Sequence, residues 1–253
     1  MAVFKNAPPN TDAINFFSVA NITDTTQCVA VANLVTDLKN YNLWDKMVTL
    51  YPFVGGTANS HKYNLKNVAT YALTFTGGLT HSQNGIQPTV SPAGIATASI
   101  AGHPATAGNM HLSFYTNQTT TVTDFPMDIG LSSVTGMSAN RNGNNYKVFY
   151  YADQGLVQAT TSPISGFHVM SRISTTSLVY YKDGTSRASS NASITSDPES
   201  TLTLGAPTPP GASFNLSGRA QQFASMGLGL TATDNLNLYT AVQRFQTTLG
   251  RQV

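Results

Sequence analysis

The segment Ser177-Leu-Val-Tyr-Tyr-Lys-Asp-Gly184 joins a run of strand-forming residues to a turn. Its β-branched and aromatic residues favour an extended strand, and the Asp183-Gly184 dipeptide is typical of the short turn between antiparallel strands. The dipeptides Asn84-Gly85 and Asn142-Gly143 predict two more turns of this kind. From Gly55 to about Leu230 the residues alternate with a period of two, and we expect the clearest strands at 71–76, 110–115, 145–151, 167–173, 177–182 and 201–204. Many short strands with regular turns indicate a sandwich or barrel.

Helical patterns precede this region. Asp24 and Gln27 have the spacing of a capping box. Apolar residues then recur at helical spacing at Cys28, Val31, Val35 and Leu38. This predicts a helix that ends near Asn40, followed by a second short helix at 43–50 that Pro52 ends. Cys28 is expected to be a buried, unreactive core residue.

A further helix is expected after the strands. Thr231 and Asp234 suit its first turn. Its apolar face carries Leu238, Val242, Phe245 and Leu249. We expect this helix to close one edge or face of the sandwich, with Phe245 and Leu249 buried.

The composition argues against several classes of protein. Hydrophobic residues make up 41% of the 253 residues, which is enough for a substantial core, whereas charged residues make up 9% and the net charge is +2. Lys and Arg are scattered singly, and nucleic-acid binding needs them clustered, so we expect no nucleic-acid partner. No run of about 18 apolar residues is present, so we expect no membrane partner. The single Cys28 excludes an intrachain disulfide.

Two groups of motifs resemble known proteins. Leu178-Val-Tyr-Tyr-Lys-Asp-Gly184 resembles a hairpin of laminin G-like and concanavalin A-like jelly rolls, and Phe223–Leu230 is similar to the last strand of that family, which runs into a closing helix. Tyr51-Pro-Phe-Val-Gly-Gly56, combined with the C-terminal segment Phe245–Val253, resembles a module at the C-termini of bacteriophage virion proteins, especially in phages of Bacteroides-type gut bacteria. The likeness covers roughly residues 22–253.

The resemblance implies a fold and a setting. The fold is expected to be all-β, a concanavalin A-like jelly-roll β-sandwich at residues 23–253 with short N-terminal helices and a C-terminal closing helix. Residues 1–22 would form an arm, which is too short for a fibre shaft. We therefore expect a non-enzymatic virion structural protein of the capsid-decoration or head-fibre type. The alternatives are a tail-fibre module that binds a receptor or glycan, and a glycan-cleaving enzyme.

Partners and location follow from this reading. The expected partners are other virion proteins, namely capsid or fibre subunits. Bacterial surface glycans and a second copy of the chain are the other two candidates. The N-terminus lacks the apolar core of an export signal, so we expect no Sec-type export. The resemblance implies that the chain is located in the phage particle, assembled in the host cytoplasm.

The sequence carries no signature of catalysis. Glycosidases use two carboxylates that flank the scissile bond, and the one glutamate, Glu199, lies in a turn-like context. The five histidines lack zinc spacing. We expect no enzymatic activity, no cofactor and no metal site. Asp124 and Asp128 are either a loop calcium site or two ordinary turn carboxylates, and we prefer the second interpretation because calcium needs six to eight oxygens.

Surface contact is the function that remains. Alternation places His111 and Tyr115 on the outer face of the strand 110–115, and it places His168 and Arg172 together on one face of 167–172. Phe149 and Tyr151 share the face of Lys147. The six candidate contact residues are His111, Tyr115, Phe149, Tyr151, His168 and Arg172. Such a mixture suits a sugar or a protein interface; alternatively, the terminal helices cover these faces and nothing external binds.

The N-terminal arm carries apolar residues that would be costly to leave in water. These residues are Phe4, Ile14, Phe16 and Phe17. One hypothesis is that they anchor the chain to another subunit of the particle, with Pro8-Pro9 keeping the arm extended. The other is that Phe16 and Phe17 staple the first helix to its own sandwich.

Overall fold

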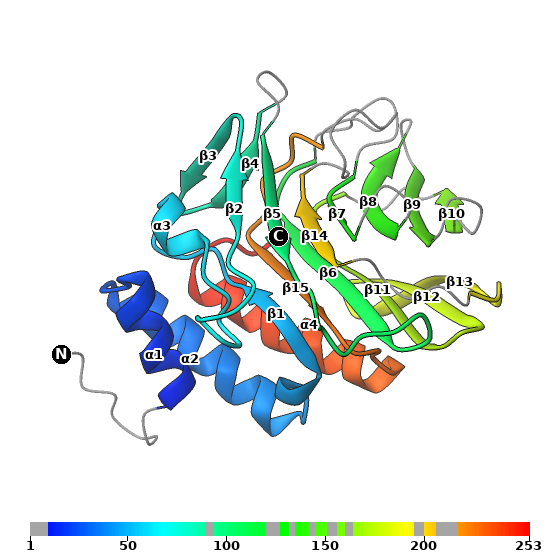
Figure 1. Ribbon diagram of the computed structural model, residues 1–253, viewed down its shortest axis with the longest axis horizontal. Coiled ribbons are helices and arrows are strands. Elements are labelled where there is room, and N and C mark those ends of the chain that lie inside the picture. The colour runs from blue at the N-terminus through cyan, green and yellow to red at the C-terminus, as the bar shows by residue number, and fades with distance from the viewer. Residues whose placement is uncertain are drawn as a thin grey trace.

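The chain folds around two antiparallel sheets (Figure 1). The computed structural model describes residues 10–89, 94–119, 127–131, 135–141, 145–150, 156–159, 164–194, 200–205 and 217–253. The first sheet has the order β1 (Met47–Tyr51), β15 (Phe223–Gly227), β6 (Met110–Thr116), β11 (Gly166–Ser174), β12 (Ser177–Lys182), β13 (Thr185–Ser190). The second sheet has the order β10 (Leu156–Ala159), β9 (Asn145–Tyr150), β8 (Thr135–Arg141), β7 (Ile129–Gly130), β14 (Thr201–Leu204), β5 (Ile95–Ser99), β2 (Thr74–Thr76). A separate hairpin pairs β3 (Leu79–Ser82) with β4 (Gly85–Pro88).

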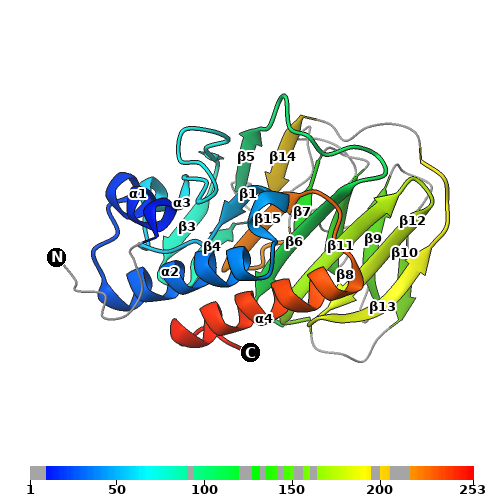
Figure 2. The same ribbon diagram turned by 90° about the horizontal axis from the view of Figure 1, so that it is seen from below.

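Helices form a third layer. Figure 2 shows α2 (Thr25–Asn40) and α4 (Ala232–Thr248) side by side under the six-stranded sheet, and the seven-stranded sheet lies on its other side. The remaining helices are α1 (Thr11–Ala20), α3 (Ala58–His61) and the 3₁₀ turn η1 (Trp44–Lys46). The predicted sandwich is therefore confirmed, but the fold is not purely all-β, because a helical layer covers one sheet. None of the helices described is long and apolar enough to cross a membrane.

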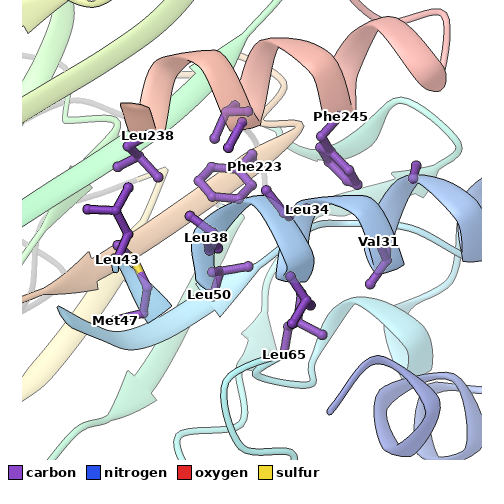
Figure 3. Close-up of a cluster of buried hydrophobic side chains, with 14 of the residues drawn as sticks. Val31, Leu34, Leu38, Leu43, Met47, Leu50, Leu65, Phe223, Leu238 and Phe245 are labelled. Carbon is purple, nitrogen blue, oxygen red and sulfur yellow. The ribbon is translucent and has the colours of Figure 1, made fainter. Parts of the chain in front are cut away.

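Two apolar clusters hold these layers together. One lies between the sheets and includes Leu112, Phe114 and Met170. The other lies between the six-stranded sheet and the helices, where Leu34, Phe223 and Phe245 meet (Figure 3). The centre of the six-stranded sheet is thus buried on both faces: every residue of β6 and β15 is buried, whereas no residue of the edge strand β13 is.

The predicted helix caps are confirmed. Asp24 accepts a hydrogen bond from the backbone N–H of Gln27 at 2.9 Å, which starts α2. Thr231 and Asp234 form a reciprocal capping box at the start of α4. Phe245 is buried as expected, and Leu249 is partly buried at the end of α4. Cys28 is buried with a free thiol whose pKa is raised by desolvation.

The predicted helix at 43–50 is wrong. Only η1 is helical there, and Met47–Tyr51 forms β1, which pairs with β15. The free edge of β1 is covered by Asn64, whose amide oxygen accepts from Leu50 N and whose amide nitrogen donates to Val48 O. Pairing with distant residues, which short-range periodicity does not register, overrides the local pattern.

The turn predictions are confirmed where the structure describes them. Asp183 and Gly184 have φ angles of 50° and 74°, as the type I′ turn between β12 and β13 requires. Asn84-Gly85 joins β3 to β4. The Asn142-Gly143 dipeptide lies outside the described residues. The strand expected from residue 71 begins only at Thr74.

Candidate functional site

Four of the predicted contact residues lie in the interior. His111, Tyr115, His168 and Arg172 are each at most 1% exposed, so the prediction of a solvent face for them is wrong. They lie on β6 and β11, at the centre of the sheet that is covered on both sides. Tyr115 belongs to the helix-side cluster, whereas Met170, next to His168 and Arg172, belongs to the cluster between the sheets.

Of the two remaining predicted contact residues, only Phe149 can be placed, on the seven-stranded sheet. Phe149 lies on β9, but its side chain and the whole of Tyr151 lie outside the described residues. The interpretation that the helices cover the predicted faces holds for His111 and Tyr115, on the helix side of the sheet.

The buried histidines are engaged with protein groups. His111 contacts Leu228 O at 2.7 Å and Ser225 Oγ at 3.1 Å through its two ring nitrogens. His168 stacks on Phe114 and contacts the Tyr180 hydroxyl at 2.7 Å. Desolvation lowers the pKa of His111 to about 4 and the pKa of His168 well below its ordinary value, so both rings are neutral near pH 7. Because Ser225 and His111 are fully buried, no substrate can reach this pair, and its role is structural.

Asp128 is neither a turn carboxylate nor part of a loop calcium site. It is fully buried and forms a bidentate ion pair with Arg219, at 2.9 Å to Nε and 2.6 Å to Nη2. It also accepts from Ala139 N at 2.7 Å. The paired Asp124 lies outside the described residues. Within the part of the chain that is described, no three His, Cys, Asp or Glu residues gather as a metal site would require.

The expected N-terminal arm contains a helix. Residues 11–20 form α1, which packs on α2. Phe16 is 1% exposed within the helix-side cluster and Phe17 packs partly against it, so the stapling interpretation describes these two residues. Ile14 is 43% exposed. Phe4 lies outside the described residues.

A cavity of about 390 Å³ lies where the start of α2 meets the chain after α4. Figure 2 shows that these two helix ends lie at the same end of the molecule. The cavity is lined by Asp24, Thr26, Gln27, Val54, Gln83, Leu249 and Arg251. Its volume is in the lower part of the range of about 300–1,000 Å³ that small-molecule sites occupy. Polar and apolar side chains therefore share this space.

Arg251 holds the walls of this cavity together. Its guanidinium is buried and donates to the backbone carbonyls of Pro52, Phe53, Gln83 and Gln222, at 3.0–3.3 Å. Its Nε donates to the side chain of Gln246 at 2.9 Å. All five N–H groups of the guanidinium are thereby engaged. Burial lowers the pKa of Arg251 to about 9, which leaves the group charged near neutral pH.

A second set of hydrogen bonds joins Gln27, which lines the cavity, to the loop after β1 and to Gln83. Gln27 accepts from Gly55 N at 2.8 Å and donates to the Gln83 side-chain oxygen at 2.5 Å. Gly55 has φ +88°, and a Cβ there would lie 2.5 Å from Ser60 Oγ. The glycine is therefore needed for the loop to approach α3 closely.

A histidine pair lies close enough to Arg251 to feel its charge. His61 Nδ1 and His81 Nδ1 are 3.1 Å apart, and the Phe53 ring packs edge-on against His61. Desolvation, His81 and Arg251 together lower the pKa of His61 to about 3, and burial lowers that of His81. Both rings are neutral near pH 7, so one Nδ1–H donates to the other ring.

Sequence reasoning missed most of this cavity. Asp24 and Gln27 were recognised only as a helix cap. Arg251 carries no signal of its own, because a lone arginine near a chain end is usually exposed.

No family model matches the sequence, and no curated protein matches it. Solved structures do share its fold. One is domain 4 of an extracellular arabinanase from Geobacillus stearothermophilus, in complex with arabinotriose, at 13% identity over 76% of this chain and 98% of that one, with a TM-score of 0.53.

Two more similar structures are larger than the region matched. Trypanosoma rangeli sialidase in complex with sialic acid is 12% identical over 82% of this chain and 38% of that one, with a TM-score of 0.59. The binding domain of botulinum neurotoxin DC in complex with SialylT is 12% identical over 79% and 52%, with a TM-score of 0.54. At these identities the likeness concerns the fold, and it confirms the expected lectin-like β-sandwich.

Proposed function

We propose that the chain is a non-catalytic carbohydrate-binding module and that the cavity beside Arg251 holds the sugar. The observation that carries this proposal is the likeness to the arabinanase domain, which was solved with arabinotriose and aligns over nearly its whole length. The cavity offers what a sugar ring needs. Val54 and Leu249 are apolar, whereas Asp24, Thr26 and Gln83 carry hydrogen-bonding groups.

A cavity-filling variant tests this proposal. The purified chain is applied to a glycan array, and the bound sugars are then titrated by calorimetry. Leu249→Trp, which places a large ring in the cavity, should weaken binding at least about tenfold, a loss of about 1.4 kcal/mol. Leu236→Trp is the matched control, because Leu236 is 53% exposed on α4 and does not line the cavity. Equal affinities for the two variants, or an empty array, would contradict the proposal.

The proposal that the module does not cleave glycans rests on its carboxylates. Hydrolysis needs a pair of them, and Asp24 is the one acidic residue among the described residues that line the cavity. Glu199 lies outside the described residues. A panel of polysaccharides incubated with the chain should release no reducing ends. Release that Asp24→Asn abolishes would establish an enzyme.

We further propose that the module works in a bacteriophage particle, as a capsid-decoration or head-fibre protein that contacts other virion proteins. The specific observation in favour concerns the two segments that resemble the phage module. Tyr51–Gly56 and the C-terminal residues meet at the cavity, where Arg251 donates to the carbonyls of Pro52 and Phe53. This contact is a physical reason for the two motifs to occur together.

Mass spectrometry of purified particles tests the setting. We expect the chain in the particle, at a copy number that matches the capsid lattice. A few copies at one vertex would favour the tail-fibre alternative. Absence of the chain from particles of a phage that encodes it would overturn the virion proposal and leave the sugar-binding proposal intact.

A further inference from the structure

Two charged residues line the cavity, and only one of them has a side chain free to contact a ligand. Arg251 lies in the wall with every N–H engaged by a protein oxygen. Asp24 is exposed; its Oδ1 caps Gln27 N, and its Oδ2 makes no hydrogen bond to any described residue. Asp24 also belongs to none of the ion pairs that the described residues form. The charge that a ligand can reach is therefore negative.

Arg251 is poorly placed to recognise an acidic ligand. A carboxylate is usually held by two parallel N–H donors of a guanidinium. Here four of the five donors point at backbone carbonyls and one at the side chain of Gln246. The oxygens bring partial negative charge around the guanidinium, which offsets its field inside the cavity. An incoming carboxylate would have to break bonds that position the wall.

We propose that Asp24 makes the cavity selective for neutral sugars over sugars that carry a carboxylate. This inference rests on the proposed function. A neutral sugar hydroxyl can donate to Asp24 Oδ2, and Thr26 supplies a hydroxyl beside it. The carboxylate of a uronic or sialic acid would instead meet Asp24 as a like charge. Two unit charges about 5 Å apart repel by enough to change an affinity about fourfold in bulk water, and more near a protein surface.

The fold alone does not decide this preference. The structures that resemble the chain were solved with arabinotriose, a neutral sugar, and with sialic acid, an acidic one. The inference therefore comes from the cavity's own charges.

Matched pairs of sugars test the inference. The probes are methyl glucoside against methyl glucuronide, and methyl galactoside against methyl galacturonide, titrated by ligand-observed NMR. Each pair differs only at C6. The chain should bind at least one neutral member about tenfold more tightly than its acidic counterpart. High salt should narrow this ratio, because it screens exposed charges.

Asp24→Asn is the decisive variant. Asparagine is as good a helix N-cap as aspartate, so the melting temperature should stay the same while the charge is lost. The ratio of neutral to acidic affinity should fall at least about threefold. A second variant, Asp24→Ser, also caps the helix and should behave alike.

Each contrary outcome has its own meaning. If the unaltered chain binds the acidic member equally well or better, the inference is overturned and the proposed function stands. A neutral preference that Asp24→Asn leaves unchanged overturns the assignment to Asp24. Failure of all four probes, together with an empty glycan array, overturns the proposed function and the inference with it.

Discussion

Truncation of Phe245 should destabilise the whole domain. The ring is 1% exposed and meets Phe223 edge-on at 6.4 Å between centroids (Figure 3). The Arg251 guanidinium lies 5.4 Å from the centre of the ring. Replacing a buried phenylalanine with alanine costs about 3–5 kcal/mol. For a domain of this size each kcal/mol shifts the melting temperature by about 2–4 °C. Phe245→Ala should therefore lower it by about 6–20 °C.

Urea unfolding and thermal melts followed by circular dichroism measure this loss. The control is Leu236→Ala on the same helix, where the side chain is 53% exposed and surface changes usually stay within about 0.5 kcal/mol. The midpoint of Phe245→Ala should fall with the slope m unchanged. If the two variants melt together, α4 does not close the sheet as described.

Three further predictions concern the polar interior and the turns. Arg251→Met should lower the free energy of unfolding measured with urea by at least about 3 kcal/mol, because it leaves several buried carbonyls without donors at about 1–3 kcal/mol each. A loss below about 1 kcal/mol would contradict the positioning role. His61 and His111 have native pKa values of about 3 and about 4, below the unfolded value of about 6.5. The unfolded state then binds more protons than the native state as the pH falls below about 6.5. The free energy of unfolding should therefore be highest above about pH 6.5 and should fall by several kcal/mol as the pH is lowered toward 4. Equal urea midpoints at pH 7 and pH 4 would refute this. Gly184→Ala should lower the melting temperature more than Gly102→Ala. Both glycines have a positive φ, but only at Gly184 would the new Cβ meet a neighbour, at 2.9 Å from a tyrosine ring of α4. Equal losses in melting temperature would refute the clash.

The sequence was informative where structure is local. Asp24 and Thr231 cap helices through side chains that lie within three residues of their partners, and Asp183-Gly184 sets a turn through its own φ angles. These features depend on short-range chemistry. A reader of the sequence can therefore place them without knowing the rest of the fold.

The sequence was misleading where the helical layer decides whether a strand residue is buried. Alternation along β6 separates His111 and Tyr115 from Leu112 and Phe114, but it does not say that both faces are covered. The layer on the helix side of the sheet, which includes the segments that flank α4 as well as α2 and α4, buries the first pair. The same limit applies to Met47–Tyr51, which became a strand through its pairing with β15.

The composition of the cavity wall determines how ligand binding and stability are linked. The cavity is built from the start of α2, the loop after β1, the β3–β4 turn and the chain after α4, so it exists only when these separate segments are packed together. A ligand that binds only the folded chain at 100 times its Kd should add about 2.7 kcal/mol of stability. Because Phe245 packs against Arg251, Phe245→Ala should also loosen the cavity wall. Its ligand-dependent gain in melting temperature should then be smaller than that of Leu236→Ala, whereas equal gains would show that the cavity forms independently of the end of α4.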